Sequence, residues 1–437
     1  MKGRRFFVLF MYSLGYMGIS IFTQTAVKWY QYYYTPPAFN TQGLKILVPI
    51  GLIGFSMIVA RIFDGVSDPI VAYYSDKLRS RWGRRIPFVL FGSPVLFLSF
   101  IMIWFPPVEH ESILNFVYLT FVLSLFFVAF TAVVAPYLAL IPEITKSAGE
   151  RITLTMMQGI TQILGVMVAE AGSGILIRIS NFKVMGIILG SFAFVTLMLT
   201  PLFVKEEPVK EEDMPTVSMF ASIKMTLSNK DFIYYLTAIT ALWFGLNTLT
   251  IAMPYITEVL LKIPAENSGF MIAGAFVVAV FFSFFVPKLS LAYGKKKVFM
   301  VFSAFFALIL GLTGLFGTVF SKTLSIVIIL LAGIPLSVFF VIPNAMIADI
   351  AELDGIKVGQ RREGMFFGAQ GFVVKVVMGI SSLVTPLLFK AFGYSAESPL
   401  GLMLCGPLAG VLILLSLVVF RNYSISEKEL EEIRRIK

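Results

Sequence analysis

Long apolar runs, separated by mostly short polar connections, repeat along almost the whole chain. A helix needs about 20 mainly apolar residues to cross a bilayer, and twelve runs meet this condition. The runs cover residues 6–34, 46–74, 87–106, 113–141, 153–177, 184–204, 231–260, 268–291, 297–319, 323–351, 364–391 and 399–421. The pattern therefore predicts an all-α membrane protein with twelve transmembrane helices.

One connection is much longer than the others. Residues 205–230 are rich in charge, contain two prolines and follow the sixth run. We therefore expect an N-terminal six-helix bundle at 1–204, a cytoplasmic linker at 205–230, a C-terminal six-helix bundle at 231–421 and a cytoplasmic tail at 422–437. This division resembles the major facilitator architecture, in which two six-helix bundles rock about a solute site near the bilayer midplane in alternating access.

Composition agrees with a chain whose main solvent is lipid. Of the 437 residues, 58% are hydrophobic and 14% are charged, whereas soluble domains carry about 25% charged residues. The first run is a full span without a small-residue cleavage site, so it is not expected to be a removed signal peptide. The single cysteine, Cys405, excludes an intrachain disulfide. We expect a multi-pass protein of the plasma membrane, monomeric in that bilayer.

The sequence has none of the motifs that common catalytic sites need. It contains no HExxH, CxxC, GxxxxGK[ST] or GxSxG pattern, and its only histidine is His110 in a polar connection. A zinc site, an ATP-driven motor and an acyl-transfer triad therefore lack their parts. We expect neither an enzyme nor a resident cofactor.

The basic residues are distributed unevenly between the two sides of the predicted membrane. Most of the 35 lysines and arginines lie in the connections on the side that also holds both termini. The basic residues on the other side are Lys45, Arg178, Lys183, Lys262, Lys322 and Lys390. By the positive-inside rule both termini are cytoplasmic. The net charge of +10 is then a topology signal with some attraction to anionic lipid, and nucleic acid is not an expected partner.

The second run contains three charged residues. Arg61, Asp64 and Asp68 are spaced i, i+3, i+7 and fall within about 60° of one another on one helix face. Carboxylates one turn apart can ligate one small, hard cation, and Pro69 leaves the carbonyl of Gly65 without its helical donor. With one arginine against two aspartates, the stripe predicts a monovalent cation site; a purely structural ion pair is the alternative.

Lys375, Lys28 and Glu170 are further charged residues inside runs. Lys375 is deep in the eleventh run, where a lysine should pair with an acid such as Asp64 or Asp68; snorkelling to the interface is the alternative. Lys28 lies nearer the end of the first run, so snorkelling is about as plausible as burial. Glu170 is a mid-run acid and a candidate for proton or solute handling.

Aromatic residues follow Lys28 in the stretch "KWYQYYYT". Two interpretations compete: an aromatic belt at the membrane interface, or ring faces that stack on a sugar or another solute. We favour the belt for Tyr33 and Tyr34. Both interpretations remain open for Trp29 and Tyr32.

Two long motifs, one in each half, resemble a known family. "RIFDGVSDPIVAYYSDKLRSRWGRRIPF" and "MIADIAELDGIKVGQRREGMFFGAQGFVVK" are similar to the signatures of the glycoside–pentoside–hexuronide:cation symporters, the melibiose-carrier branch of the major facilitators. The resemblance implies coupling of inward Na⁺, Li⁺ or H⁺ movement to sugar uptake. The residues that it assigns to the cation site are Arg61, Asp64, Asp68, Thr131 and, as counter-charge, Lys375.

The solute side matches this family less well. The family's charged sugar-binding positions correspond to Ser20, Val134 and Gln158, and Asn344 replaces a tryptophan. Candidate solute-binding residues are Ser20, Gln24, Lys28, Trp29, Gln158, Gln162, Glu170, Asn247, Asn344 and Gln370. Any of them can instead form a helix–helix hydrogen bond. We expect a carbohydrate as the solute, with a lysolipid or another non-sugar solute as the alternative.

Acids and bases gather at the cytoplasmic ends of the second and third runs and of the tenth and eleventh. The expected gate residues are Asp76, Arg79, Arg81, Arg84, Arg85, Asp349, Glu352, Arg361, Arg362 and Glu363. Exposed ion pairs are individually weak, about 0–1 kcal/mol, which suits contacts that must break in each transport cycle. Topology control and solvation of the connections are the alternative explanation.

Overall fold

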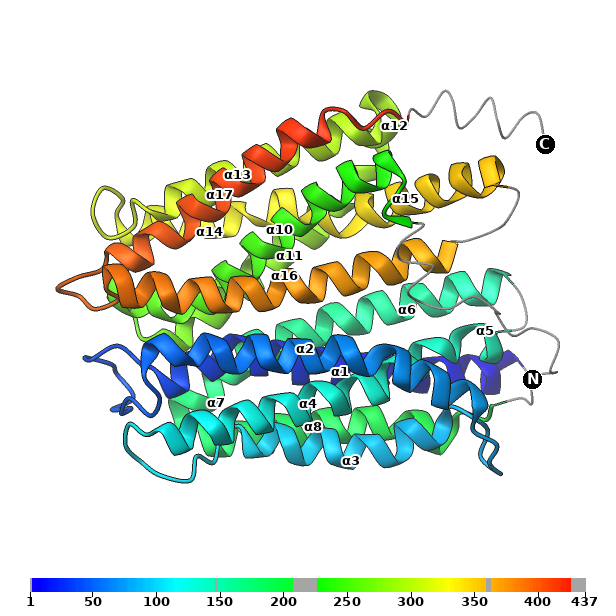
Figure 1. Ribbon diagram of the computed structural model, residues 1–437, viewed down its shortest axis with the longest axis horizontal. Coiled ribbons are helices and arrows are strands. Elements are labelled where there is room, and N and C mark those ends of the chain that lie inside the picture. Colours follow the sequence, from blue (N-terminus) through cyan, green and yellow to red (C-terminus); the bar gives the residue numbers. More distant parts are fainter. Residues whose placement is uncertain (1, 146–147, 207–225, 359–362, 426–437) are drawn as a thin grey trace. The chain divides into compact units, whose positions relative to one another are not determined.

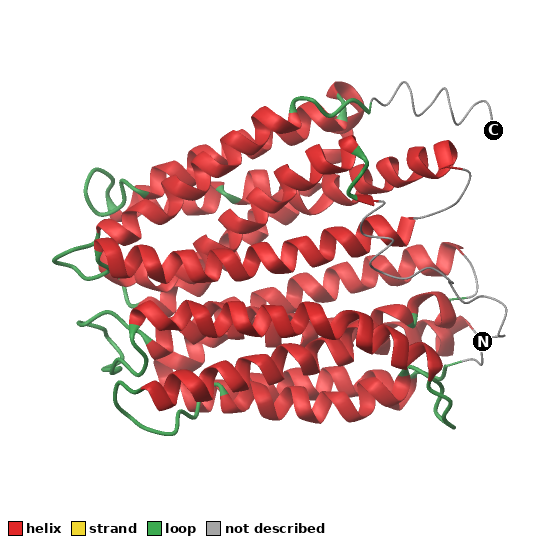
Figure 2. Ribbon diagram, in the orientation of Figure 1, coloured by secondary structure: helices red, strands yellow, loops and turns green. Residues whose placement is uncertain are grey.

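The computed structural model describes residues 2–145, 148–206, 226–358 and 363–425. Nearly all of these residues lie in helices, and no strand occurs among them (Figures 1 and 2). Most of the expected linker, and the expected tail beyond residue 425, lie outside the described residues.

The chain forms two compact units. Unit 1 comprises Met1–Met214 together with Met253–Glu258 and Ile263–Ala273, and unit 2 comprises Pro215–Ala252, Val259–Lys262 and Gly274–Lys437. The main division falls inside the connection that the sequence singled out. Two short stretches from the second half nevertheless belong to unit 1, which the hydropathy pattern did not suggest.

Unit 1 is a bundle of helices from the first half of the chain. Its helices are α1 (Lys2–Tyr34), α2 (Ile50–Lys77), α3 (Ile86–Met102), α4 (Ile113–Ala139), α5 (Ile141–Ile144), α6 (Ala148–Met167), the π-helical turn η1 (Val168–Gly172), α7 (Ser173–Ile179) and α8 (Phe182–Phe203). Helix α1 packs against α6 and α8, α2 packs against α4, and α3 packs against α4 and α8. Helices α6, η1 and α7 together form one span.

Unit 2 contains most of the second half. The second half of the chain forms α10 (Lys230–Tyr255), the π-helical turn η3 (Ile256–Leu260), the 3₁₀ turn η4 (Ala265–Asn267), α11 (Ser268–Ser283), α12 (Val286–Tyr293), α13 (Lys295–Thr313), α14 (Lys322–Leu331), α15 (Gly333–Val358), α16 (Glu363–Phe392) and α17 (Leu400–Phe420). Unit 1 takes the end of α10, parts of η3, η4 and the start of α11.

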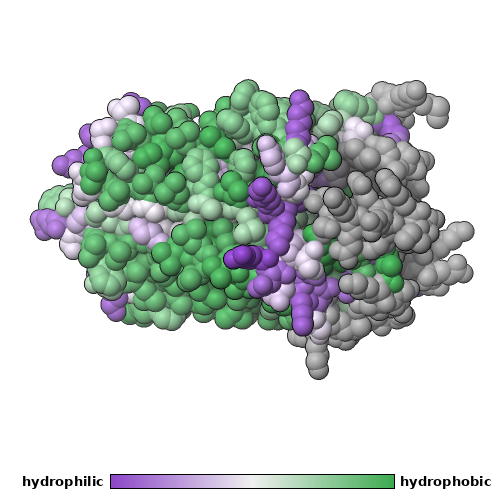
Figure 3. Space-filling model, turned by 90° about the horizontal axis from the view of Figure 1, so that it is seen from above, coloured by the Kyte–Doolittle hydropathy of each residue, from purple (hydrophilic) through white to green (hydrophobic). Residues whose placement is uncertain are grey.

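The apolar runs form helices of the expected kind. Among the described residues, 11 helices are long and apolar enough to cross a membrane, and Ile86–Met102 is a shorter apolar helix. The all-α membrane fold is therefore confirmed. Large apolar side chains also cover much of the surface that Figure 3 displays, as expected for a chain whose surroundings are lipid.

Two predicted runs are broken. The run 268–291 forms α11 and α12, and Pro287 occupies the first turn of α12, where its missing N–H is tolerated. The run 323–351 forms α14 and α15, which meet at Ala332. Hydropathy does not detect such breaks because apolar residues continue through them.

Candidate functional site

Helices α2 and α4 bring two carboxylates and a hydroxyl together inside unit 1. The Thr131 hydroxyl donates to Asp64 Oδ1 at 2.6 Å and lies 3.3 Å from Asp68 Oδ1. On the other side of Asp64, Arg61 Nη1 lies 3.2 Å from Oδ2. Asp64 is buried and Asp68 is half-buried. We call Arg61, Asp64, Asp68 and Thr131 the α2–α4 cluster.

The local sequence explains why these side chains meet. The i, i+3, i+7 spacing keeps Arg61, Asp64 and Asp68 on the face of α2 that packs against α4. Helix α2 continues through Pro69, which cannot donate to the carbonyl four residues earlier. The Ser67 hydroxyl donates to the Asp64 carbonyl at 2.8 Å, so backbone oxygens of this turn take part in local bonding.

The four side chains of the α2–α4 cluster carry a formal charge of −1. Arg61 neutralises one carboxylate, and its guanidinium carbon lies 4.0 Å from the centre of the Phe127 ring, a cation–π geometry. Carboxylate and hydroxyl oxygens suit a hard cation, so this residue set fits a monovalent ion. The Arg61–Asp64 contact also realises the structural ion pair that the sequence left as the alternative.

Lys375 belongs to unit 2. It is a half-buried residue of α16, and its expected role as the counter-charge of Asp64 or Asp68 stays a prediction.

A second buried charge pair joins α1 to η1. Lys28 Nζ lies 2.6 Å from Glu170 Oε2, and the two side chains are 0% and 2% exposed. Lys28 also lies over the ring of Trp29, 4.8 Å from its centroid, and Trp29 Nε1 donates to Ser173 Oγ at 2.8 Å. The snorkelling interpretation of Lys28 is therefore wrong, because its ammonium is enclosed by protein and paired with Glu170.

The tyrosines after Trp29 do not form an interfacial belt. Tyr33 and Tyr34 are buried, and their hydroxyls donate to the carbonyls of Trp104 at 3.1 Å and Ile103 at 2.9 Å. The belt interpretation is wrong because these donors close the end of α3 instead of facing lipid headgroups. Tyr32 is also buried, and its hydroxyl donates to Glu258.

The other solute-binding candidates of unit 1 lie on α1 and α6. Ser20 donates to the Tyr16 carbonyl of its own helix at 3.0 Å, and Gln24 is half-buried on α1. Gln158 is buried on α6, whereas Gln162 is exposed. The structure brings Lys28, Trp29 and Glu170 together and does not collect all the candidates of this unit in one cluster.

Unit 2 contains three candidates. The Tyr235 hydroxyl donates to Gln370 Oε1 at 2.7 Å. Asn247 Nδ2 lies 2.7 Å from Ser381 Oγ and 3.0 Å from Ser382 Oγ, which joins α10 to α16. Asn344 is exposed on α15. The contacts of Gln370 and Asn247 are helix–helix hydrogen bonds in this structure.

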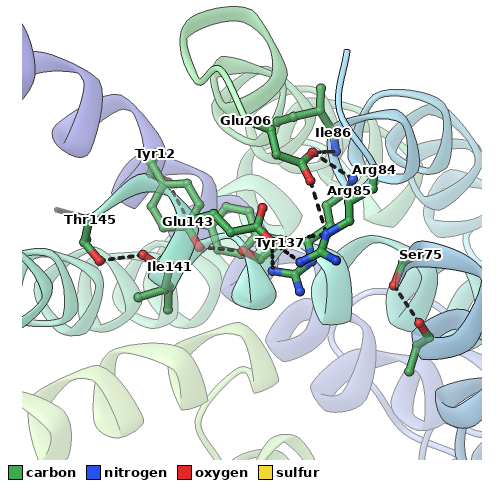
Figure 4. A network of polar contacts seen from close by, with 11 residues as sticks. Tyr12, Ser75, Arg84, Arg85, Ile86, Tyr137, Ile141, Glu143, Thr145 and Glu206 are labelled. Atoms are coloured by element: carbon green, nitrogen blue, oxygen red, sulfur yellow. Dashed lines mark hydrogen bonds and ion pairs between the residues drawn. The ribbon is translucent and has the colours of Figure 1, made fainter. Parts of the chain in front are cut away.

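Two arginines of the expected gate have acidic partners in unit 1 (Figure 4). Arg84 Nη2 lies 2.6 Å and Arg85 Nη1 lies 2.8 Å from Glu143 Oε1. The backbone N–H groups of Arg85 and Ile86 donate to Glu206 Oε2 at 2.8 and 3.2 Å. The sequence reasoning missed both acids. The only available signal was that each stands in a connection on the strongly basic side.

The Glu206 carboxylate is enclosed by the turn that precedes α3, whose backbone N–H groups donate to it. Gly83 has a φ of +101°, and a Cβ there would overlap the Glu206 carboxylate, so glycine provides both the conformation and the space. Burial raises the pKa of Glu206 above its ordinary value, although the N–H donors and Arg84 favour the charged form.

The remaining gate residues have different surroundings. Arg79 and Arg81 are exposed, and Arg81 lies over the Trp82 ring. In unit 2, Asp349 pairs with Lys295, and Glu352 is half-buried. Arg361 and Arg362 lie outside the described residues, as do the side chains of Asp76 and Glu363. A gate made by ion pairs across the two halves therefore stays a prediction.

Comparison with known proteins gives consistent matches along the chain. A family model described as MFS/sugar transport protein matches residues 11–427. The isoprimeverose transporter of Lactiplantibacillus pentosus is 24% identical over 364 residues, covering 80% of this chain and 74% of that protein. The sodium-dependent lysophosphatidylcholine symporter 1 of Xenopus tropicalis is 23% identical over 429 residues, covering 84% and 79%. The crystal structure of the nucleoside transporter NupG has the same fold, with a TM-score of 0.68, 13% identity and coverage of 95% and 99%.

Proposed function

This chain belongs to the MFS/sugar transport protein family, and on that premise we propose that it couples inward movement of a monovalent cation to uptake of a sugar or glycoside. The resemblance to the glycoside–pentoside–hexuronide:cation symporters is confirmed by the family match and by relatives named as transporter and symporter. The protein is a multi-pass membrane transporter and not an enzyme. The proposal concerns its ion, its solute and its direction.

The observation that carries the proposal is the α2–α4 cluster. Asp64 Oδ1 and Asp68 Oδ1 are joined through one hydroxyl, that of Thr131, and carboxylate and hydroxyl oxygens are the ligands that a hard cation prefers. We propose that these oxygens hold a Na⁺ or Li⁺, or that one of the two carboxylates takes up H⁺. The Thr131 hydroxyl can then turn a lone pair toward the ion, because a hydroxyl is both donor and acceptor.

The mechanism follows from the position of the two carboxylates inside the bundle. Negative charge there is costly, so an ion bound between Asp64 and Asp68 stabilises the state in which solute is held. Coupling is reciprocal: solute must raise the affinity for the ion by the same factor. In the proposed orientation both termini are cytoplasmic, the membrane is the plasma membrane, and the protein acts as a monomer by alternating access.

The test is uptake into proteoliposomes that contain the purified full-length chain. A panel of sugars and glycosides is offered under inward Na⁺, Li⁺ or H⁺ gradients. Asp64→Asn and Asp68→Asn should abolish the dependence of uptake on the ion gradient. Glu111→Gln, which changes an exposed acid, is the matched control and should leave it intact. Full ion dependence in both aspartate variants would contradict the proposed cation site.

A lysolipid is the second candidate solute. It is favoured by the loss of charged residues at the positions of Ser20, Val134 and Gln158, since a sugar site normally pairs each buried hydroxyl. The similarity to a sodium-dependent lysophosphatidylcholine symporter supports it as well. Lysolipids therefore form the second arm of the uptake panel, with the same aspartate variants.

A further inference from the structure

Part of the second half of the chain is built into unit 1. We call Met253–Glu258 and Ile263–Ala273 the closing segment, because both stretches pack with unit 1 near the C-terminal end of α1. The Tyr255 hydroxyl donates to the Thr35 carbonyl at 2.9 Å and lies 3.1 Å from the Thr35 hydroxyl. This contact joins residues 220 positions apart in the sequence.

The Glu258 carboxylate accepts three hydrogen bonds, which hold the closing segment in place. One carboxylate oxygen accepts from the Thr41 backbone N–H at 2.6 Å and from the Thr41 hydroxyl at 2.8 Å. The other accepts from the Tyr32 hydroxyl. Hydrogen bonds to a carboxylate are stronger than neutral ones. Glu258 lies in the π-helical turn η3, a type of irregularity often found at functional sites.

Elsewhere in the closing segment, the backbone closely approaches the rest of unit 1. A Cβ on Gly269 would overlap the carbonyl of Glu170 and lie 3.0 Å from Lys28 Nζ, and a Cβ on Gly174 would overlap the carbonyl of Glu266. The segment therefore covers the buried Lys28–Glu170 pair. That pair lies at the other π-helical turn, η1, so each π-helical turn contributes one acid to this region.

Several polar atoms in the covered region lack partners. Among the described residues, both amide atoms of Gln31, Glu266 Oε2 and Ser268 Oγ are buried without a hydrogen-bond partner. Gln31 lies one turn from Lys28 and from Thr35 on α1, and both of these residues contact the segment. Buried polar atoms without partners disfavour the closed state, and water would satisfy them once the segment lifts.

We propose that the closing segment is a detachable cover over the Lys28–Glu170 pair, and that Glu258 is the positioning residue that latches it. The Glu258 bonds and the backbone contacts hold the cover shut, while the unpartnered polar atoms favour its release. The role of the cover in transport rests on the proposed function, since the assigned orientation turns this end of unit 1 to the outside. Its opening does not depend on that function.

The opening can be measured without any solute. In a Cys405→Ala background, Gln31→Cys provides a buried thiol under the cover. Reaction with a water-soluble maleimide is followed in proteoliposomes of the full-length protein. Glu258→Gln should accelerate labelling about tenfold, because the amide keeps the size but weakens the acceptor. Thr41→Val, at an exposed residue that keeps its backbone N–H, should accelerate it less and cannot disturb the core.

Glu266→Gln is the matched control, because it changes another acid of the same segment whose Oε2 has no partner among the described residues. It should not accelerate labelling. Equal rates in the parent, Glu258→Gln and Thr41→Val proteins would overturn the latch, as would equal acceleration by Glu266→Gln. Faster labelling in a protein that transports neither sugars nor lysolipids would uphold the latch and remove the proposed function.

Discussion

Thr131 is the residue on which the α2–α4 cluster depends. Its hydroxyl contacts both carboxylates, so it keeps two like charges on neighbouring turns within reach of one ion. Asp64 is buried, and no solvent replaces a lost donor at that depth. The cluster should therefore be more sensitive to the hydroxyl than to the volume of the side chain.

Replacing Thr131 by valine should weaken ion binding without unfolding the bundle. Valine removes the hydroxyl oxygen that the proposed site offers to the ion as a ligand, so the half-saturating ion concentration in proteoliposome uptake should rise about tenfold, which corresponds to about 1.4 kcal/mol. Thr131→Ser, which keeps the hydroxyl, should stay close to the parent. An unchanged ion concentration in Thr131→Val would remove Thr131 from the ion site.

The Lys28–Glu170 pair makes a different prediction, because both charges are buried and paired. Removing one partner leaves a charge without compensation and should cost about 3–5 kcal/mol. Lys28→Met and Glu170→Gln should each lower the apparent thermal stability strongly. The double variant should be no less stable than either single variant. Additive losses in the double variant, measured by thermal unfolding in detergent, would mean that the two charges do not interact.

Between elements, α1 and α8 of unit 1 approach each other closely at Gly18. A Cβ on Gly18 of α1 would overlap the carbonyl of Ala193 on α8, whereas nothing lies within 4 Å of the corresponding point at Gly159 on α6. Gly18→Ala must separate two helices and should cost about 2 kcal/mol. Gly159→Ala should be neutral or stabilising, by up to about 1 kcal/mol. Thermal unfolding of the two variants compares them, and equal stability would contradict close packing at Gly18.

The turn before α3 predicts a pH effect. Since burial raises the pKa of Glu206, folding favours its protonated form. The stabilisation is present below the unfolded pKa of about 4.3 and is lost as pH rises through the higher folded pKa. The apparent melting temperature of the parent, relative to that of Glu206→Gln, should therefore fall as the pH rises above about 4.3. A difference that grows with pH would show that the N–H donors dominate over burial.

Sequence periodicity predicted the elements better than their irregularities and partners. The apolar runs located the spans, and the i, i+3, i+7 spacing put Asp64 and Asp68 on one face because both signals are local. The π-helical turns left no mark in composition, since a shifted hydrogen bond changes no residue type. Glu170 was noticed as an isolated acid, but its partner Lys28 lies 142 residues away. Such pairs depend on tertiary packing, which one sequence does not encode in a readable local pattern.

At the scale of the whole molecule, the distribution of lysine and arginine predicts the orientation, and the structure supplies accessible positions to test it. Phe39 is 80% exposed, and Ser80 and Asn422 are exposed at connections on the strongly basic side. Each is changed singly to cysteine in the Cys405→Ala background. In intact cells a membrane-impermeant maleimide should label Phe39→Cys at once. The connections on that side carry few basic residues and are therefore expected to lie outside the cell. Ser80→Cys and Asn422→Cys should react only after the membrane is permeabilised. The reverse pattern would invert the topology and turn the closing segment toward the cytoplasm, which would make it an inner cover.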